Sequence, residues 1–178
     1  MYVLTIICCL IAAVYGQRVG IGPCPTVKAS KTIDIDKYSG KWYEWETSNS
    51  LSSICSSSTW TKHSDSIITV VHRSISKITN LESGIIGDVT INDEKVNVQY
   101  NMPMGRNIEV EYRILDTDYE NFSILWSCSN FKLVHYTHLS VHVRDPNVEP
   151  NNLKIGVTIK EAGVNPPPMR KVDHSNCP

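Results

Sequence analysis

The sequence predicts an all-β fold, an antiparallel sandwich or barrel. It contains eight short runs rich in Val, Ile, Thr, Tyr and Trp, with polar breaks between them. The connections are short and no segment of helical periodicity interrupts the series, which argues against alternating strands and helices. The eight runs are 41–47, 58–63, 67–75, 85–92, 95–102, 107–116, 122–129 and 133–144.

Alternation along these runs gives each strand an apolar and a polar face. In the run 107–116 the apolar positions are Ile108, Val110, Tyr112 and Ile114. In the run 122–129 they are Phe122, Ile124, Trp126 and Cys128, opposite Ser123, Leu125 and Ser127. Closing eight such strands into a barrel leaves an interior that side chains fill or that holds one small ligand.

The overall charge argues against nucleic acid as a partner. The chain has 17 Lys and Arg against 18 Asp and Glu, for a formal net charge of −1. A nearly balanced charge provides no basic excess for phosphate binding. Its 178 residues fit one domain.

The N-terminus predicts secretion. Residues 5–15 are apolar except for Thr5, a run too short to span a bilayer as a helix. We therefore expect a signal peptide at 1–16, with Gln17 starting a mature domain at 17–178. A buried N-terminal strand is the alternative. No later segment approaches membrane length, so we expect no membrane span.

The cysteines fit the same compartment. Without Cys8 and Cys9 of the leader, four remain: Cys24, Cys55, Cys128 and Cys177. An even number in a secreted chain implies two disulfides, with three possible pairings. None stands in a C-x-x-C pair, which disfavours a zinc site or a redox motif.

The segment 150–162 has two interpretations. Pro150 near its start and Gly163 after its end favour a helix. The apolar residues alternate, at Leu153, Ile155, Val157 and Ile159, which favours a strand. The pattern alone leans toward the strand.

Three short motifs, in this order, resemble those of the lipocalin family, specifically its apolipoprotein D and insect bilin-binding branch. Gly40-Lys41-Trp42 resembles the motif at the entry to the first strand. Thr117-Asp118-Tyr119 resembles the second motif, in a turn before a later strand, and Arg144 the third. The resemblance covers nearly the whole mature chain.

The resemblance implies an eight-stranded antiparallel up-and-down lipocalin barrel with a C-terminal helix packed outside. It implies the disulfides Cys24–Cys128 and Cys55–Cys177, and it places a helix at 151–162 against the alternation. Trp42 would plug the closed end of the barrel with Arg144 across its ring, a cation–π contact. Gly40 would let the chain turn tightly into the strand. These residues are expected to be structural.

A ligand cavity is the expected functional site. We expect a small hydrophobic molecule, such as a fatty acid, steroid or bilin, to be bound there and transported, buried without a covalent bond. The expected lining residues are Tyr100, Tyr112, Ile114, Phe122, Ile124, Trp126 and His138. Each of them would serve equally well as filling in a barrel too tight for a ligand.

Other candidate sites are weaker. His138 and His142 share one face of a strand about 13 Å apart, too far for a shared metal ion, so we expect neither metal nor cofactor. They are expected to be surface residues or to hydrogen-bond a ligand. Asn121 begins the glycosylation sequon Asn-Phe-Ser. Met102 and Met104 would line the barrel mouth or lie in a solvent-facing loop.

Enzyme chemistry is disfavoured. The sequence has no Gly-x-Ser-x-Gly, His-Glu-x-x-His or phosphate-binding motif, and all four mature cysteines match disulfide positions. The rival to a carrier is a filled barrel that acts through protein contacts, which exposed apolar residues such as Leu115 or Leu125 would favour. A cell-surface receptor is compatible with either interpretation, and the oligomeric state is left open.

Overall fold

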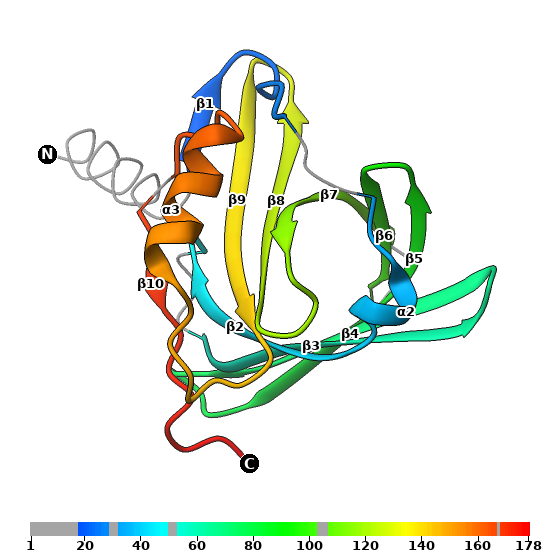
Figure 1. Ribbon diagram of the computed structural model, residues 1–178, viewed down its shortest axis with the longest axis vertical. Helices are drawn as coiled ribbons and strands as arrows, with labels where there is room; N and C mark the ends of the chain where they lie inside the picture. The colour runs from blue at the N-terminus through cyan, green and yellow to red at the C-terminus, as the bar shows by residue number, and fades with distance from the viewer. Residues whose placement is uncertain (1–17, 29–31, 50–52, 103–106, 167) are drawn as a thin grey trace, which may run out of the picture.

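The chain folds into a closed antiparallel barrel (Figure 1). The computed structural model describes residues 18–28, 32–49, 53–102, 107–166 and 168–178, so the expected signal peptide lies outside the described residues. The elements are β1 (Arg18–Ile21), α2 (Ile35–Tyr38), β2 (Gly40–Thr47), β3 (Ser53–Ser64), β4 (Ile67–Ser76), β5 (Glu82–Asn92), β6 (Lys95–Asn101), β7 (Asn107–Thr117), β8 (Phe122–Phe131), β9 (Val134–Val143), α3 (Asn152–Glu161) and β10 (Arg170–Lys171).

Strands β2 to β9 pair in sequence order, and β9 pairs back with β2 to close the barrel. The N-terminal half of β9 pairs instead with β1, and β10 pairs with the end of β2. All of these pairings are antiparallel, as the short connections predict. The eight barrel strands correspond to the eight predicted runs, which confirms the expected fold.

The helix α3 lies outside the barrel (Figure 1). Asn151 caps it, since its side-chain oxygen accepts a hydrogen bond from the backbone N–H of Lys154 at 3.1 Å. Ile155 and Ile159, one turn apart, are buried, whereas Leu153 is 80% exposed. The segment is therefore a helix and not the strand that its alternation favours. Of its four alternating apolar residues, only Ile155 and Ile159 pack against the barrel.

Two apolar clusters occupy opposite sides of the barrel wall. The inner cluster fills one end of the barrel and includes Tyr38, Trp42, Trp60 and Ile114. The outer cluster packs β7, β8 and β9 against α3 and includes Leu115, Phe122, Ile124, Trp126, Leu139, Val141, Ile155 and Ile159. Both faces of these strands are thus buried, one inside the barrel and the other beneath the helix.

Two disulfides tie the terminal segments to the barrel. Cys24 bonds to Cys128 on β8, and Cys55 on β3 bonds to Cys177. These are the two pairings that the resemblance implies. They enclose sequence separations of 104 and 122 residues, so both constrain nearly the whole domain, and they fit an oxidising, extracellular compartment.

Candidate functional site

The barrel encloses a cavity of about 980 Å³ between the inner apolar cluster and the opposite end. Apolar side chains contribute to its wall, among them Ile85, Leu125 and Met102. Polar side chains also line it, including Glu44, Ser56, Ser57, His72, Tyr100, Tyr112, His138, Ser140 and His142. The described residues therefore leave the interior unfilled, with a wall of mixed character.

A chain of hydrogen bonds crosses three strands of this wall. The Tyr100 hydroxyl lies 2.9 Å from His72 Nε2 and 3.0 Å from the Tyr112 hydroxyl. Burial raises the pKa of Tyr100, and the neighbouring Tyr112 adds to that rise. Burial likewise raises the pKa of Tyr112. Both phenols are thus neutral hydrogen-bonding groups, and they lie at the cavity as the sequence predicts.

The polar face of β9 points into the barrel. His138 Nε2 lies 3.1 Å from Thr47 Oγ1, and His142 Nε2 lies 3.0 Å from Ser140 Oγ. Burial lowers the pKa of His138 to about 4 and, together with the charges of His72 and His138, that of His142 to about 3. Because protonation is unfavourable there, both imidazoles are neutral at pH 7. The interpretation of these histidines as surface residues is wrong.

His72 completes the set of three cavity histidines. Burial, with His138 as a secondary cause, lowers the pKa of His72 to about 4. In the described part of the chain, no group of three or more His, Cys, Asp or Glu side chains is arranged to hold a metal ion. At neutral pH the three imidazoles therefore present uncharged hydrogen-bonding groups to the cavity.

Glu44 is the acidic group of the wall. It stands two residues after Trp42 on the inner face of β2, opposite His142 of β9. Burial raises the pKa of Glu44, an effect that Thr47, Arg170 and Ser56 oppose. Glu44 is not among the expected lining residues, although the strand period of two places it on the same face as Trp42.

Three of the expected lining residues lie on the other side of the wall. Phe122, Ile124 and Trp126 face outward from β8 and pack beneath α3 in the outer cluster. The polar face of β8 turns inward instead: the Ser123 hydroxyl lies 2.9 Å from the Tyr38 hydroxyl, and Leu125 lines the cavity. The assumption that the apolar face of this strand points inward is wrong, because the helix covers the outside.

Ile114 is inside the barrel but not at the cavity. It is 1% exposed within the inner cluster, among the side chains that fill the closed end. Of the expected lining residues, the structure therefore brings Tyr100, Tyr112 and His138 together around the cavity. The lining residues that the sequence did not identify are mostly polar: Glu44, His72 and the serines of β3 and β9.

The closed end is built around Arg144 and Trp42. The guanidinium carbon lies 3.7 Å from the centroid of the Trp42 ring. Its nitrogens donate hydrogen bonds to backbone carbonyl oxygens of Lys37, Tyr38, Ser39, Lys41 and Tyr119. Gly40 has a φ of +103°, and a Cβ there would lie 3.1 Å from Arg144 Nη1. These residues have the structural roles that the resemblance implies.

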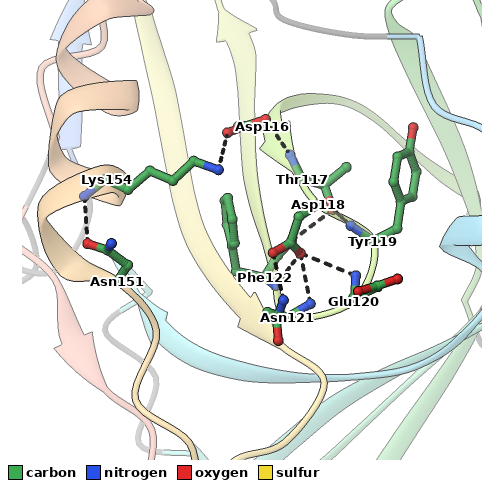
Figure 2. A network of polar contacts seen from close by, with 9 residues as sticks. All are labelled: Asp116, Thr117, Asp118, Tyr119, Glu120, Asn121, Phe122, Asn151 and Lys154. Carbon is green, nitrogen blue, oxygen red and sulfur yellow. Dashed lines mark hydrogen bonds and ion pairs between the residues drawn. The ribbon is translucent and has the colours of Figure 1, made fainter.

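The turn between β7 and β8 forms the adjoining polar network (Figure 2). The Asp118 carboxylate accepts hydrogen bonds from the backbone N–H groups of Glu120, Asn121 and Phe122 at 2.8–3.2 Å. These bonds lower the pKa of Asp118 although burial opposes them. The Thr117 hydroxyl donates to the Phe122 carbonyl oxygen and accepts from the N–H of Tyr119. Thr117, Asp118 and Tyr119 therefore shape the turn.

The same network reaches the helix and the expected glycosylation site. Lys154 of α3 lies 3.6 Å from the Asp116 carboxylate (Figure 2). Asn121 is exposed, and its side-chain amide donates to Asp118 at 2.9 Å. Its glycosylation stays a prediction. Among the described residues, no helix is both long and apolar enough to cross a membrane.

Comparison with known proteins agrees with this architecture. Apolipoprotein D of Mus musculus is 27% identical over 177 residues, covering 92% of this chain and 88% of its own. Insecticyanin from the tobacco hornworm Manduca sexta superposes with a TM-score of 0.77 at 20% identity, over 90% of this chain and 91% of its own. These likenesses confirm the lipocalin fold.

A second solved structure shares the fold, and a family model covers the barrel. The amine binding protein of Rhodnius prolixus, in its tryptamine complex, superposes with a TM-score of 0.64 at 20% identity, over 79% of this chain and 81% of its own. The family model described as Triabin matches residues 22–155. Since that match extends from the end of β1 into α3, the chain belongs to the triabin family.

Proposed function

We propose that this protein is a secreted carrier that binds a small, largely apolar ligand with polar groups in the barrel cavity. The cavity of about 980 Å³ carries the proposal, because ligand sites typically measure roughly 300–1,000 Å³ and combine apolar walls with a few placed polar groups. Ile85 and Leu125 supply apolar surface. Tyr112 and His138 supply neutral hydrogen-bonding groups.

The filled-barrel alternative has less support. Its expected signature is an interior packed with side chains, with Leu115 or Leu125 uncovered. Leu115 and Leu125 are 1% and 3% exposed, Leu115 beneath α3 and Leu125 at the cavity. The amine binding protein of similar fold was solved with tryptamine, which shows that a related barrel accommodates a small molecule.

Secretion rests on the leader and on the disulfides. Residues 1–16 have the composition of a signal peptide, and the two disulfides are typical of an oxidising compartment. Expression in a secreting eukaryotic host, followed by N-terminal sequencing of the medium fraction, should give a chain that begins at Gln17. Retention of residues 1–16 would contradict the assignment.

A cavity-filling variant tests the carrier function. Ile85 is half-buried and lines the cavity, so Ile85→Trp places an indole in the space that the ligand would occupy. Ile78→Trp is the matched control, because Ile78 is 86% exposed. Calorimetric titrations use biliverdin, retinol, oleate and tryptamine. At least one of these ligands should bind the wild type and Ile78→Trp, and the same ligand should fail to bind Ile85→Trp. Equal binding by both variants would contradict the proposal.

A further inference from the structure

The charge of the cavity wall is one-sided. Among the described residues that line it, Glu44 is the acidic group and Arg73 the basic one. The Arg73 side chain is 66% exposed, and its Nη1 lies 3.3 Å from the Glu82 carboxylate. The positive charge is therefore directed to solvent and paired there. The three histidines add no charge at pH 7, because burial keeps them neutral.

Among the described residues, the cation that acts on Glu44 does not line the cavity. Arg170 acts on it electrostatically, but that guanidinium hydrogen-bonds the carbonyl oxygens of Asn49 and Ser53 and does not line the cavity. The pKa of Glu44 is raised despite Arg170, because burial is the larger effect. An ionised carboxylate in this position lacks full compensation until another positive group approaches it.

His142 offers an unused hydrogen-bonding atom next to this carboxylate. Its side chain is 6% exposed and lines the cavity, and Glu44 is its partner across the β2–β9 pairing. Nε2 lies beside Ser140 Oγ, but Nδ1 is buried with no hydrogen-bond partner in the described structure. In the tautomer that donates from Nε2, Nδ1 is a lone-pair acceptor. An unpaired buried acceptor is costly unless a ligand or water satisfies it.

We propose that the cavity selects a cationic amine, with the ammonium group held by Glu44 and His142 and the apolar body against Ile85 and Leu125. This inference rests on the proposed carrier function. An ammonium group brings three N–H donors and a positive charge to a wall that offers a carboxylate and an imidazole lone pair. A ligand carboxylate at the same place would bring acceptors and a second negative charge.

Three ligands that differ only in the head group test the inference without any variant. Octylamine, octanol and octanoate share one apolar body and carry a cationic, a neutral and an anionic end at neutral pH. Calorimetric titration of the intact secreted protein should show octylamine binding about tenfold more tightly than octanol, a ratio expected for one charge-assisted hydrogen bond. Octanoate should bind most weakly. Equal affinities, or a preference for octanoate, would overturn the amine assignment and leave the carrier function intact.

A variant that removes the charge of Glu44 tests whether this side chain causes the preference for the amine. Glu44→Gln keeps the shape of the side chain and should remove the preference, so that octylamine and octanol bind this variant with about equal affinity. Glu109→Gln makes the same change of net charge at an exposed position on β7 and should keep the wild-type preference. Unchanged amine preference in Glu44→Gln would overturn the inference. If none of the three ligands binds the wild type while oleate or biliverdin does, the amine inference fails alone; if nothing binds, the carrier function fails with it.

Discussion

The guanidinium carbon of Arg144 lies 3.7 Å from the centroid of the Trp42 ring, although the two residues are 102 positions apart in the sequence. The same group hydrogen-bonds five carbonyl oxygens, four of them between Lys37 and Lys41 and one on Tyr119. Arg144 thereby joins the end of β9 to the start of β2 and to the turn before β8. The closed end of the barrel depends on this one side chain.

Replacing Arg144 with Gln should destabilise the protein by about 2–3 kcal/mol, because several carbonyl oxygens lose a charged donor and Trp42 loses its cation. Arg144→Lys should recover only part of the loss, since an ammonium group cannot reproduce the planar fork. Urea denaturation measures both. Arg73→Gln, at an exposed ion pair, is the control and should stay within about 0.5 kcal/mol of wild type. A similar loss in both Gln variants would contradict the role given to Arg144.

Two glycine variants should change stability in opposite directions. Gly40→Ala should destabilise by about 1–2 kcal/mol, because its φ is +103° and the new Cβ would lie 3.1 Å from Arg144 Nη1. Gly156→Ala should stabilise by about 0.5–1 kcal/mol, because that glycine is in α3 with nothing within 4 Å of the added Cβ. Thermal denaturation of the two proteins side by side would show the opposite signs, and a shared sign would refute the local account.

Loss of either disulfide should cost several kcal/mol. The separations of 104 and 122 residues correspond to about 4–5 kcal/mol each in the chain-entropy model. Paired Cys→Ala variants, one for each bond, should show the loss in urea denaturation. Thiol titration of the secreted protein in denaturant without reductant should find no free thiol. A titratable thiol would mean that one of the two bonds is incomplete.

Stability should fall with acid in a definite window. The pKa values of His72, His138 and His142 are lowered from 6.5 to about 4, 4 and 3, so below pH 6.5 the unfolded chain binds protons that the folded barrel excludes. The stabilisation is complete above pH 6.5 and is lost as the pH falls toward 4 and 3. Each histidine contributes at most about 1.4 kcal/mol per pH unit.

A histidine variant checks the origin of this slope. His138→Gln should reduce the pH dependence of the free energy of unfolding between pH 6.5 and 4 by one histidine's share. Ser127→Ala, at a buried neighbour that does not titrate and pairs with His138 across β8 and β9, should keep the wild-type slope. If the slope of His138→Gln equals that of the wild type, the cavity histidines are not its source.

Sequence patterns predict the strands because strand period and turn residues follow local rules, whereas the closed end and the pairing of the cysteines are implied by the resemblance to the lipocalin family. Strand period, turn residues and the motifs around Gly40, Thr117 and Arg144 all refer to backbone geometry that the fold requires. Alternation separates the two faces of β8 correctly, but it does not say which face is inside. Phe122 and Trp126 face outward because α3 covers them, and α3 is too far away in the sequence for a strand pattern to indicate this contact.

The polar wall is harder to predict for a related reason. A barrel interior is expected to be apolar, so Glu44, His72 and the serines of β3 resemble surface or loop residues in the sequence. The first half of β3 was missed for this reason: Ser56 and Ser57 lie in a serine-rich stretch with little strand propensity, yet they line the cavity. Only closure of the barrel brings these side chains to face one another.

Native mass spectrometry of the protein secreted from its own source, with an absorption spectrum of the same sample, tests the carrier function most directly. We predict a bound small molecule, seen as a mass above that of the disulfide-bonded mature chain and released on denaturation. A visible absorption band would identify the ligand as a pigment. An empty protein that also takes up no biliverdin, oleate, retinol or octylamine would contradict the account and favour a barrel that acts through its outer surface.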